Sequence, residues 1–200
     1  MRAPSFRFRL KNHSCKMDRS IIFILDRSGS MESCRSDTIG GFNACLNDQK
    51  ALGGKISLNL FDHEYTPVYS EMDLAEAPLL TMETFQPRGM TALLDAIGST
   101  IKNWTGSANP TVIILTDGFE NASKTYSKAH IKDLIEQKTK EGWTFVYLGA
   151  NQDAFTEAGN MGIAPQCTMN FDTRRTPEAF GRLSETLSSQ TPAASFNFAS

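Results

Sequence analysis

Five oxygen-bearing side chains stand out because of their types and their positions in the chain. Asp26, Ser28 and Ser30 alternate in the segment DRSGS, directly after the apolar run IIFIL. Thr91 follows a glycine-containing loop, and Asp117 follows the apolar run VIIL and a threonine. Two carboxylates and three hydroxyls, with no sulfur or imidazole among them, suit a hard divalent cation such as Mg²⁺. The sequence therefore predicts a cation site built from these five residues.

The five residues can meet only if the apolar runs form neighbouring strands. Short apolar runs rich in β-branched residues alternate with segments of helical periodicity, which is typical of an α/β fold on a mostly parallel sheet. The predicted strands cover residues 21–25, 56–61, 65–69, 112–115, 144–148 and 166–170. Ligands of such sheets bind where the carboxyl ends of strands converge, so Asp26, Thr91 and Asp117 should share one rim.

Helical patterns fill the intervals, at residues 38–52, 91–104, 126–141, 154–161 and 176–187. Gly53 and Gly54 follow the first of these helices, where a left-handed cap is expected. Pro67 cannot donate to a sheet ladder, so the strand that contains it should lie at an edge and pair antiparallel with its predecessor. The sequence thus predicts one antiparallel edge strand in an otherwise parallel sheet.

The composition describes an ordinary folded domain. The chain has 200 residues, of which 40% are hydrophobic and 21% charged, with a formal net charge of −2. This charge gives no reason to expect binding to nucleic acid or to an anionic membrane, and no apolar run approaches the ~20 residues of a membrane span. Cysteines lack any CxxC spacing and are predicted to be reduced thiols, without disulfides or zinc; they are Cys15, Cys34, Cys45 and Cys167.

The two ends of the chain differ from its middle. Residues 1–17 are basic and lack the apolar segment of a secretory signal, so they are predicted to form a disordered leader. A solvated tail, or a functional start at Met17, is favoured over mitochondrial targeting. The folded domain should cover residues 18–188, and residues 189–200 should form a flexible tail, although its two phenylalanines could dock on the domain.

Each motif also has a simpler interpretation. Ser28 and Ser30 could cap a helix, Thr91 could be the N-cap of the next helix, and Asp117 with Gly118 could form a turn. The joint occurrence of all these residues at the ends of predicted strands favours the cation site. Even then, the metal could serve only as a structural clip.

Other polar residues are weaker candidates. The segment Asp-His-Glu at 62–64 could bind a second metal, but a charged turn of a hairpin is favoured. Asp153 could reach the rim, but an acid at the start of a helix is favoured. Glu120 and Asn121 follow Asp117 closely and could contact a partner.

The sequence resembles the von Willebrand factor A domain with its metal-ion-dependent adhesion site, over most of residues 18–187. DRSGSM carries the DxSxS pattern at Asp26, Ser28 and Ser30, RGMTALLDAIG carries Thr91, and ILTDGFEN carries Asp117. The resemblance implies a doubly wound, Rossmann-like sheet with helices on both faces, Mg²⁺ or Mn²⁺ on its rim, and an open coordination position for a partner's carboxylate.

The motif sequence DRSGSM and the lack of a signal peptide favour the intracellular, bacterial-type branch of that family. Members of this branch look like parts of assemblies, often beside ATPases. The resemblance therefore implies a cytoplasmic protein.

Two classes of function remain open. The first is a non-enzymatic binding module whose cation recognises an Asp or Glu of a partner protein, or a scaffold of the same fold whose metal is only structural. The second is a metal-dependent phosphohydrolase that uses Asp26 as nucleophile. Such enzymes resemble DxDxT/V, and the second acid is replaced here by Ser28, which does not titrate near neutral pH. The chain contains neither GxGxxG nor GxxxxGK[ST], so a nucleotide site is disfavoured.

Overall fold

The structure, a computed structural model, describes residues 19–106, 108–150, 153–189 and 196–198. The predicted leader at residues 1–17 lies outside the described residues. A six-stranded sheet runs through the domain in the order β3-β2-β1-β4-β5-β6. The strands are β1 (Ser20–Asp26), β2 (Lys55–Phe61), β3 (Tyr65–Asp73), β4 (Thr111–Thr116), β5 (Thr144–Ala150) and β6 (Thr168–Phe171).

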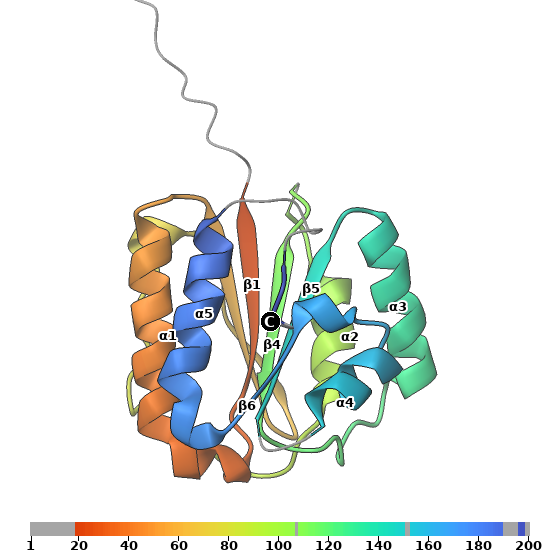
Figure 1. The fold of residues 1–200 in the computed structure, drawn as a ribbon. Helices are drawn as coiled ribbons and strands as arrows, with labels where there is room; N and C mark the ends of the chain where they lie inside the picture. Colours follow the sequence, from red (N-terminus) through yellow and green to blue (C-terminus); the bar gives the residue numbers. More distant parts are fainter. Residues whose placement is uncertain (1–18, 107, 151–152, 190–195, 199–200) are drawn as a thin grey trace, which may run out of the picture.

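Helices cover both faces of this sheet (Figure 1). In Figure 1, α1 and α5 lie on one side of the strands, and α2 and α3 lie on the other. The helices are α1 (Arg35–Lys50), α2 (Leu93–Asn103), α3 (Lys128–Lys140), α4 (Ala154–Asn160) and α5 (Thr176–Ser188), with short 3₁₀ segments η1 (Gly29–Cys34), η2 (Leu74–Glu76), η3 (Pro165–Cys167) and η4 (Thr173–Arg175). The predicted doubly wound α/β class is confirmed.

Strand pairing follows the prediction as well. β1 pairs in parallel with β2 and β4, and the ladder continues in parallel through β5 to β6. Only β3 runs antiparallel, paired with β2 at the edge of the sheet. Pro67 lies in that edge strand, opposite Asn59. The missing N–H of Pro67 is tolerated there because an edge strand has a partner on one side only.

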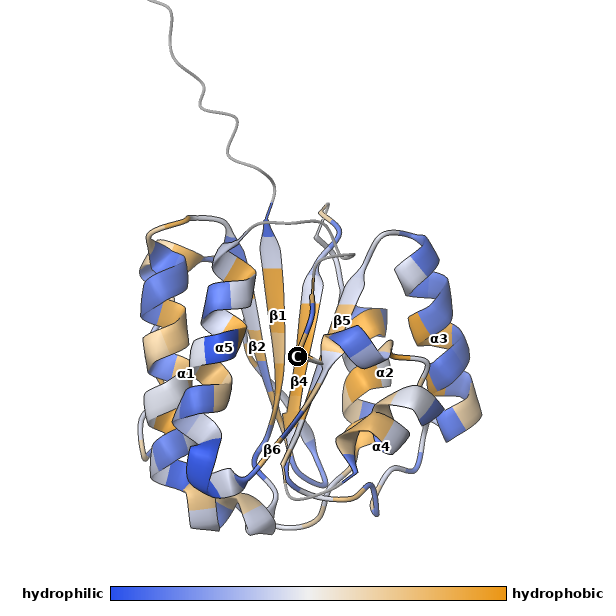
Figure 2. Cartoon of the chain, viewed as in Figure 1, coloured by the Kyte–Doolittle hydropathy of each residue, from blue (hydrophilic) through white to orange (hydrophobic). Residues whose placement is uncertain are grey.

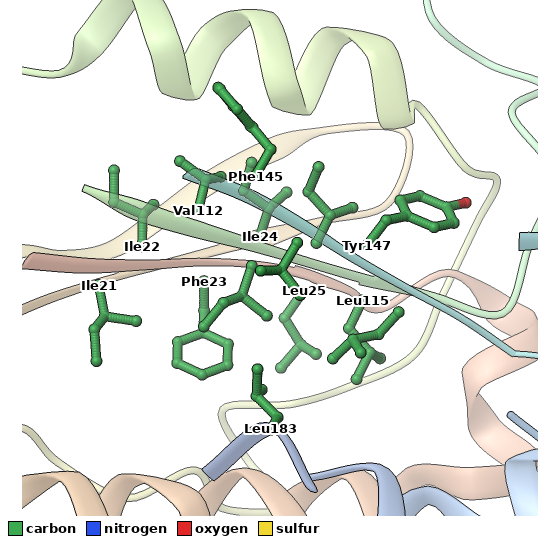
Figure 3. Close-up of a cluster of buried hydrophobic side chains, with 14 of the residues drawn as sticks. Ile21, Ile22, Phe23, Ile24, Leu25, Val112, Leu115, Phe145, Tyr147 and Leu183 are labelled. Atoms are coloured by element: carbon green, nitrogen blue, oxygen red, sulfur yellow. The ribbon is translucent and has the colours of Figure 1, made fainter. Parts of the chain in front are cut away.

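The core lies on both faces of the central strands. Every residue of β1 is buried, because helices cover the sheet on both sides. Phe23 points toward Leu183 of α5, whereas Ile22 and Ile24 point to the opposite side (Figure 3). The rings of Phe23 and Phe42 of α1 meet edge to face at 5.1 Å between centroids. Figure 2 shows the same division, with apolar strands inside and polar outer faces on the helices.

Several predicted strand boundaries differ from the structure. β5 ends at Ala150 rather than at the predicted residue Leu148, and the two largest remaining differences have a local cause. β3 continues to Asp73, beyond the predicted end at Tyr69, because an irregularity at Glu71 (φ 49°) lets the ladder with β2 resume. The backbone N–H of Glu71 donates to the Ser57 hydroxyl at 2.9 Å. At the other edge, β6 begins at Thr168, two residues later than predicted, because η3 forms a 3₁₀ turn before it.

Part of the predicted flexible tail is docked. Phe196 and Phe198 are buried at 6% exposure each, and their rings lie 6.0 Å apart. The backbone N–H of Phe198 donates to the carbonyl of Gln166 at 3.1 Å. The prediction of a loose tail is therefore wrong for residues 196–198, and the docking that the sequence left open occurs.

Two further properties concern the described residues as a whole. Cys34, Cys45 and Cys167 are buried free thiols, and Cys15 lies outside the described residues. Among the helices of the described segments, none combines the length and the apolar character needed to cross a membrane.

Candidate metal centre

The predicted site lies between β1 and β4, where the order in which strands are added to the sheet reverses. From β1 the chain moves outward to β2 and β3, and then returns to form β4 on the other flank of β1. β1 and β4 are therefore parallel neighbours, with Leu25 opposite Leu115. Asp26 ends β1, and Asp117 follows β4 directly. The two carboxylates emerge side by side at a topological switch point, where ligands of open α/β sheets bind.

Asp26 is fully buried, and both of its carboxylate oxygens accept hydrogen bonds. The backbone N–H of Ser28 donates to Oδ1 at 2.6 Å, and the Thr116 hydroxyl donates to Oδ2 at 2.5 Å. Burial raises the pKa of Asp26 to about 6, although these hydrogen bonds act in the opposite direction. Thr116 is thus a supporting residue of the site, which the sequence prediction did not include.

The two serines link Asp26 to Asp117. The Ser28 and Ser30 hydroxyl oxygens lie 3.1 Å apart, and the Ser30 hydroxyl donates to Asp117 Oδ1 at 2.5 Å. Ser28 precedes η1, yet its side chain makes no capping hydrogen bond. The capping interpretation is therefore wrong for Ser28. Burial raises the pKa of Asp117, and the bond from Ser30 partly opposes this rise.

Thr91 reaches the same rim from the loop before α2. The predicted helix over residues 91–104 begins only at Leu93, because the Thr91 backbone is held elsewhere. Its N–H donates to Asn121 Oδ1 at 2.9 Å, and its carbonyl accepts from the Asn121 N–H at 3.0 Å. Ala92 occupies the N-cap position. Thr91 is buried at 3% exposure and is not the cap of this helix.

The first turn of α2 is capped by the loop that follows Asp117. The N–H of Leu94 donates to Glu120 Oε2 at 2.9 Å, and the N–H of Asp95 donates to Ser123 Oγ at 3.0 Å. Glu120 and Asn121, suggested by the sequence as partner contacts, thus hold the Thr91 segment against this loop. Because a distant loop caps α2, the hydroxyl of Thr91 does not serve as its cap and can contribute to the site on the rim.

The three hydroxyls converge on one small space beside Gly118. A Cβ atom at Gly118 would lie 2.7 Å from Thr91 Oγ1, 3.5 Å from Ser30 Oγ and 3.6 Å from Ser28 Oγ. With the bonds that join these serines to the two aspartates, the structure brings together all five predicted residues. Gly118 was not among them. The signal that identifies it is its place next to Asp117, where only a hydrogen side chain leaves the hydroxyls open.

The residues present fit a hard divalent cation. Their donor atoms are all oxygens, the two carboxylates supply negative charge, and the absent side chain of Gly118 leaves room among the hydroxyls. Ser28, Ser30 and Thr91 would hold the ion together with Asp26 and Asp117.

The charged turn at residues 62–64 has a different role. Asp62 is fully buried and accepts from Arg27 Nε at 2.9 Å and from Arg88 Nε at 2.8 Å. Burial alone would raise the pKa of Asp62, but the bonds from Arg88 and the Glu64 N–H and the charge of Arg27 outweigh it, so the pKa is lowered. A carboxylate between two guanidinium groups is poorly suited to bind a cation, in agreement with the predicted turn.

This ion-paired turn holds the rim loops together. The Asp62 carbonyl accepts from the Ala92 N–H at 2.8 Å, and the Arg88 N–H donates to the Arg27 carbonyl at 2.8 Å. The Gly29 N–H donates to the Gly89 carbonyl at 3.2 Å. The loops that carry the two serines and Thr91 are therefore joined by backbone bonds around Asp62.

Asp153 behaves as the favoured interpretation predicts. Its carboxylate accepts from the N–H of Thr156 at 3.1 Å and caps α4. It is a helix-start residue rather than a member of the rim.

Comparison with solved structures identifies the fold. Proximal thread matrix protein 1 from the mussel byssus, solved with zinc in its MIDAS motif, superposes with a TM-score of 0.63 at 13% identity, over 86% of this chain and 48% of that one. A von Willebrand factor type A protein from Catenulispora acidiphila gives 0.59 at 17% identity, over 85% and 42%. This chain has the von Willebrand factor A fold.

The same fold occurs in the manganese-loaded TRAP protein of Plasmodium vivax, with a TM-score of 0.56 at 16% identity, over 82% of this chain and 72% of that one. The chain spans slightly less than half the length of the mussel and Catenulispora proteins. No protein-family model matches the sequence, and no curated protein matches it either.

Proposed function

We propose that this von Willebrand factor A domain is a metal-dependent protein-binding module rather than an enzyme. A divalent cation, Mg²⁺ or Mn²⁺, is held on the rim by Asp26, Ser28, Ser30, Thr91 and Asp117. The bound cation supplies a position that attracts an anionic oxygen, which an Asp or Glu of a partner protein presents.

The observation that carries the proposal is the cluster of three hydroxyls around Gly118. Hydroxyls are neutral ligands, so a cation that they hold keeps much of its charge for a further ligand. The zinc-occupied motif of the mussel protein supports a metal at such a site in this fold, and the TRAP protein, which shares the fold, is manganese-loaded.

The alternative of a phosphohydrolase has less support. An aspartate nucleophile must present a carboxylate oxygen to a phosphorus atom. Asp26 is fully buried, and both of its oxygens are engaged by Ser28 and Thr116. The position two residues later carries a hydroxyl that cannot act as general acid at neutral pH. The hydroxyl at Ser28, in place of a second acid, favours a ligand-holding role for Asp26 over a nucleophilic one.

A cytoplasmic location, within an assembly that contains an ATPase, forms part of the proposal. Its support is the sequence resemblance to the intracellular branch alone.

Capture of partners from native extract tests the proposal. Immobilised domain should retain a partner in Mg²⁺ or Mn²⁺ and release it in excess chelator. Ser30→Ala and Thr91→Ala should reduce capture at least tenfold while the fold is preserved, because each removes one hydroxyl and little buried surface. Ser70→Ala, at an exposed position on β3, is the matched control. Capture that survives both chelator and Thr91→Ala would show that binding uses another face and that the metal is only structural.

A further inference from the structure

Two apolar side chains are unusually exposed at the rim. Phe119 is 61% exposed and Met90 is 56% exposed. The other exposed large hydrophobic residues in the described part of the chain reach only 41–45%; they are Leu52, Val68, Leu79, Met82 and Phe155. Single exposed apolar residues are common on protein surfaces. It is less expected that the two most exposed ones both lie within two positions of a candidate metal ligand.

Both residues are direct neighbours of the site in sequence and in space. Met90 immediately precedes Thr91, and Phe119 immediately follows Gly118, so each is one peptide unit, about 3.8 Å between Cα atoms, from a residue of the site. The two loops are fixed to each other, because Asn121 bonds both the N–H and the carbonyl of Thr91. Each of the two joined loops therefore carries one exposed apolar residue within two positions of a candidate ligand.

We propose that the preferred ligand is an extended segment of a partner protein in which the Asp or Glu has an apolar neighbour. This inference rests on the proposed function, since the acidic side chain must reach the cation. The neighbouring side chain then contacts Phe119 and Met90. An anionic oxygen and an apolar group side by side match a cationic centre with an apolar border.

The two parts of this recognition have separate physical origins. The cation attracts any carboxylate and so selects acidic segments without regard to their neighbours. Phe119 and Met90 gain only when apolar surface covers them, and removal of that surface from water favours the apolar-flanked acid. Methionine and phenylalanine are also among the residues enriched at protein interfaces. Phe119 and Met90 therefore determine which acidic segment is preferred, and the cation determines whether any segment binds.

Short synthetic peptides test this directly. The first carries a central glutamate between two leucines, the second a glutamate between two serines, and a third has the leucines but glutamine in the centre. Fluorescence anisotropy with the Mn²⁺-loaded protein measures their affinities. We expect the leucine-flanked glutamate peptide to bind about tenfold more tightly than the serine-flanked one, from the burial of part of two apolar side chains. The glutamine peptide should bind at least tenfold more weakly than its glutamate counterpart.

Variants distinguish the contribution of Phe119 and Met90 from that of the cation. The double variant Phe119→Ser with Met90→Ser should lose the preference for leucine and keep the affinity for the serine-flanked peptide. Leu52→Ser, at 43% exposure just after α1, is the control and should change neither. Equal, chelator-sensitive binding of both glutamate peptides would overturn this inference and leave the proposed function intact. Binding that ignores chelator, or that does not distinguish glutamate from glutamine, would overturn the proposed function as well.

Discussion

Ser30 donates its hydroxyl hydrogen to Asp117 at 2.5 Å, although 87 positions of sequence separate the two residues. The bond joins the loop after β1 to the loop after β4, on neighbouring parallel strands. It shows that the fold itself brings the candidate ligands together. A cation would therefore meet ligands already placed by the core, and removal of the cation should leave the domain folded.

Mg²⁺ or Mn²⁺ should nevertheless stabilise the native state. The unfolded chain separates the five ligands, so the ion binds the folded form alone. At about 100 times its dissociation constant, an ion adds roughly 2.7 kcal/mol to the free energy of unfolding. For a domain of this size, this corresponds to about 5–10 °C in melting temperature. Calorimetry with each metal and with chelator measures it. A shift that persists in both Asp26→Ala and Asp117→Ala would place the ion elsewhere.

Gly118→Ala should weaken this metal response without unfolding the domain. The new methyl group would lie 2.7 Å from Thr91 Oγ1 and close to both serine hydroxyls, in the space that the cation requires. Titration calorimetry should show Mn²⁺ affinity reduced at least tenfold.

Gly40→Ala provides the control for that substitution. Gly40 lies within α1, and a Cβ there meets nothing within 4 Å, so alanine should raise stability by about 0.5–1 kcal/mol and leave metal binding unchanged. If Gly118→Ala retained full Mn²⁺ affinity, the space beside the hydroxyls would not be the cation site.

The fold and the convergence of the five candidate ligands could be predicted because their signals are local. A buried parallel strand reads as a continuous apolar run, and the residues after such runs must meet at one rim. The start of α2 could not be predicted in this way. Thr91 precedes a helical pattern and resembles an N-cap, but bonds from Asn121 and Asp62, far away in sequence, hold the preceding segment out of the helix.

Supporting residues were missed for the same reason. Thr116 reads as the last residue of an apolar strand, and its bond to Asp26 exists only because β1 and β4 are neighbours. Glu120 reads as an exposed acid, and its capping of α2 depends on how two loops pack. The partners of a polar side chain depend on tertiary structure, which periodicity does not encode.

Cation affinity should fall as the pH falls below about 6. Burial raises the pKa of Asp26 to about 6, and the pKa of Asp117 is raised as well, so protons compete with the cation for both carboxylates. Between pH 7.5 and pH 5 we expect Mn²⁺ affinity to decrease about tenfold or more, since one pKa unit corresponds to a tenfold change in protonation. Titration calorimetry across this range measures it, and an affinity independent of pH would exclude Asp26 as a ligand.

Asp26→Asn should stabilise the metal-free protein at pH 7. Because the pKa of Asp26 is raised from 3.8 to about 6 in the folded state, protonation of this carboxyl group stabilises the native state. This stabilisation is lost as the pH rises through about 6. Asparagine keeps the neutral form, can accept from the Ser28 N–H and can donate to Thr116. We expect a gain of about 1–3 kcal/mol at pH 7 that disappears near pH 4. Urea unfolding in chelator measures it, and a variant that is less stable than the natural chain at pH 7 would contradict the prediction.

Asp62→Asn should have the opposite effect. Asp62 is fully buried, and its partner Arg27 has a side chain only 12% exposed, so the substitution leaves a partly buried guanidinium without its counter-charge. We expect a loss of about 2–4 kcal/mol at pH 7. The pKa of Asp62 is lowered in the folded state, so its ionised carboxylate stabilises the fold at pH values above the pKa of the unfolded state. This stabilisation is lost as the pH falls through the pKa of the folded state. The difference between variant and natural chain should therefore shrink in acid.

Since the Asp62 carbonyl bonds the Ala92 N–H beside Thr91, Mn²⁺ affinity should also weaken, by about threefold to tenfold. Thr66→Val, which removes a hydroxyl bonded to Arg27 but no charge, is the control and should leave the affinity unchanged. Urea unfolding at pH 7 and pH 3.5, with Mn²⁺ titration at pH 7, decides the matter; unaltered stability at pH 7 would show that the two arginines need no buried counter-charge.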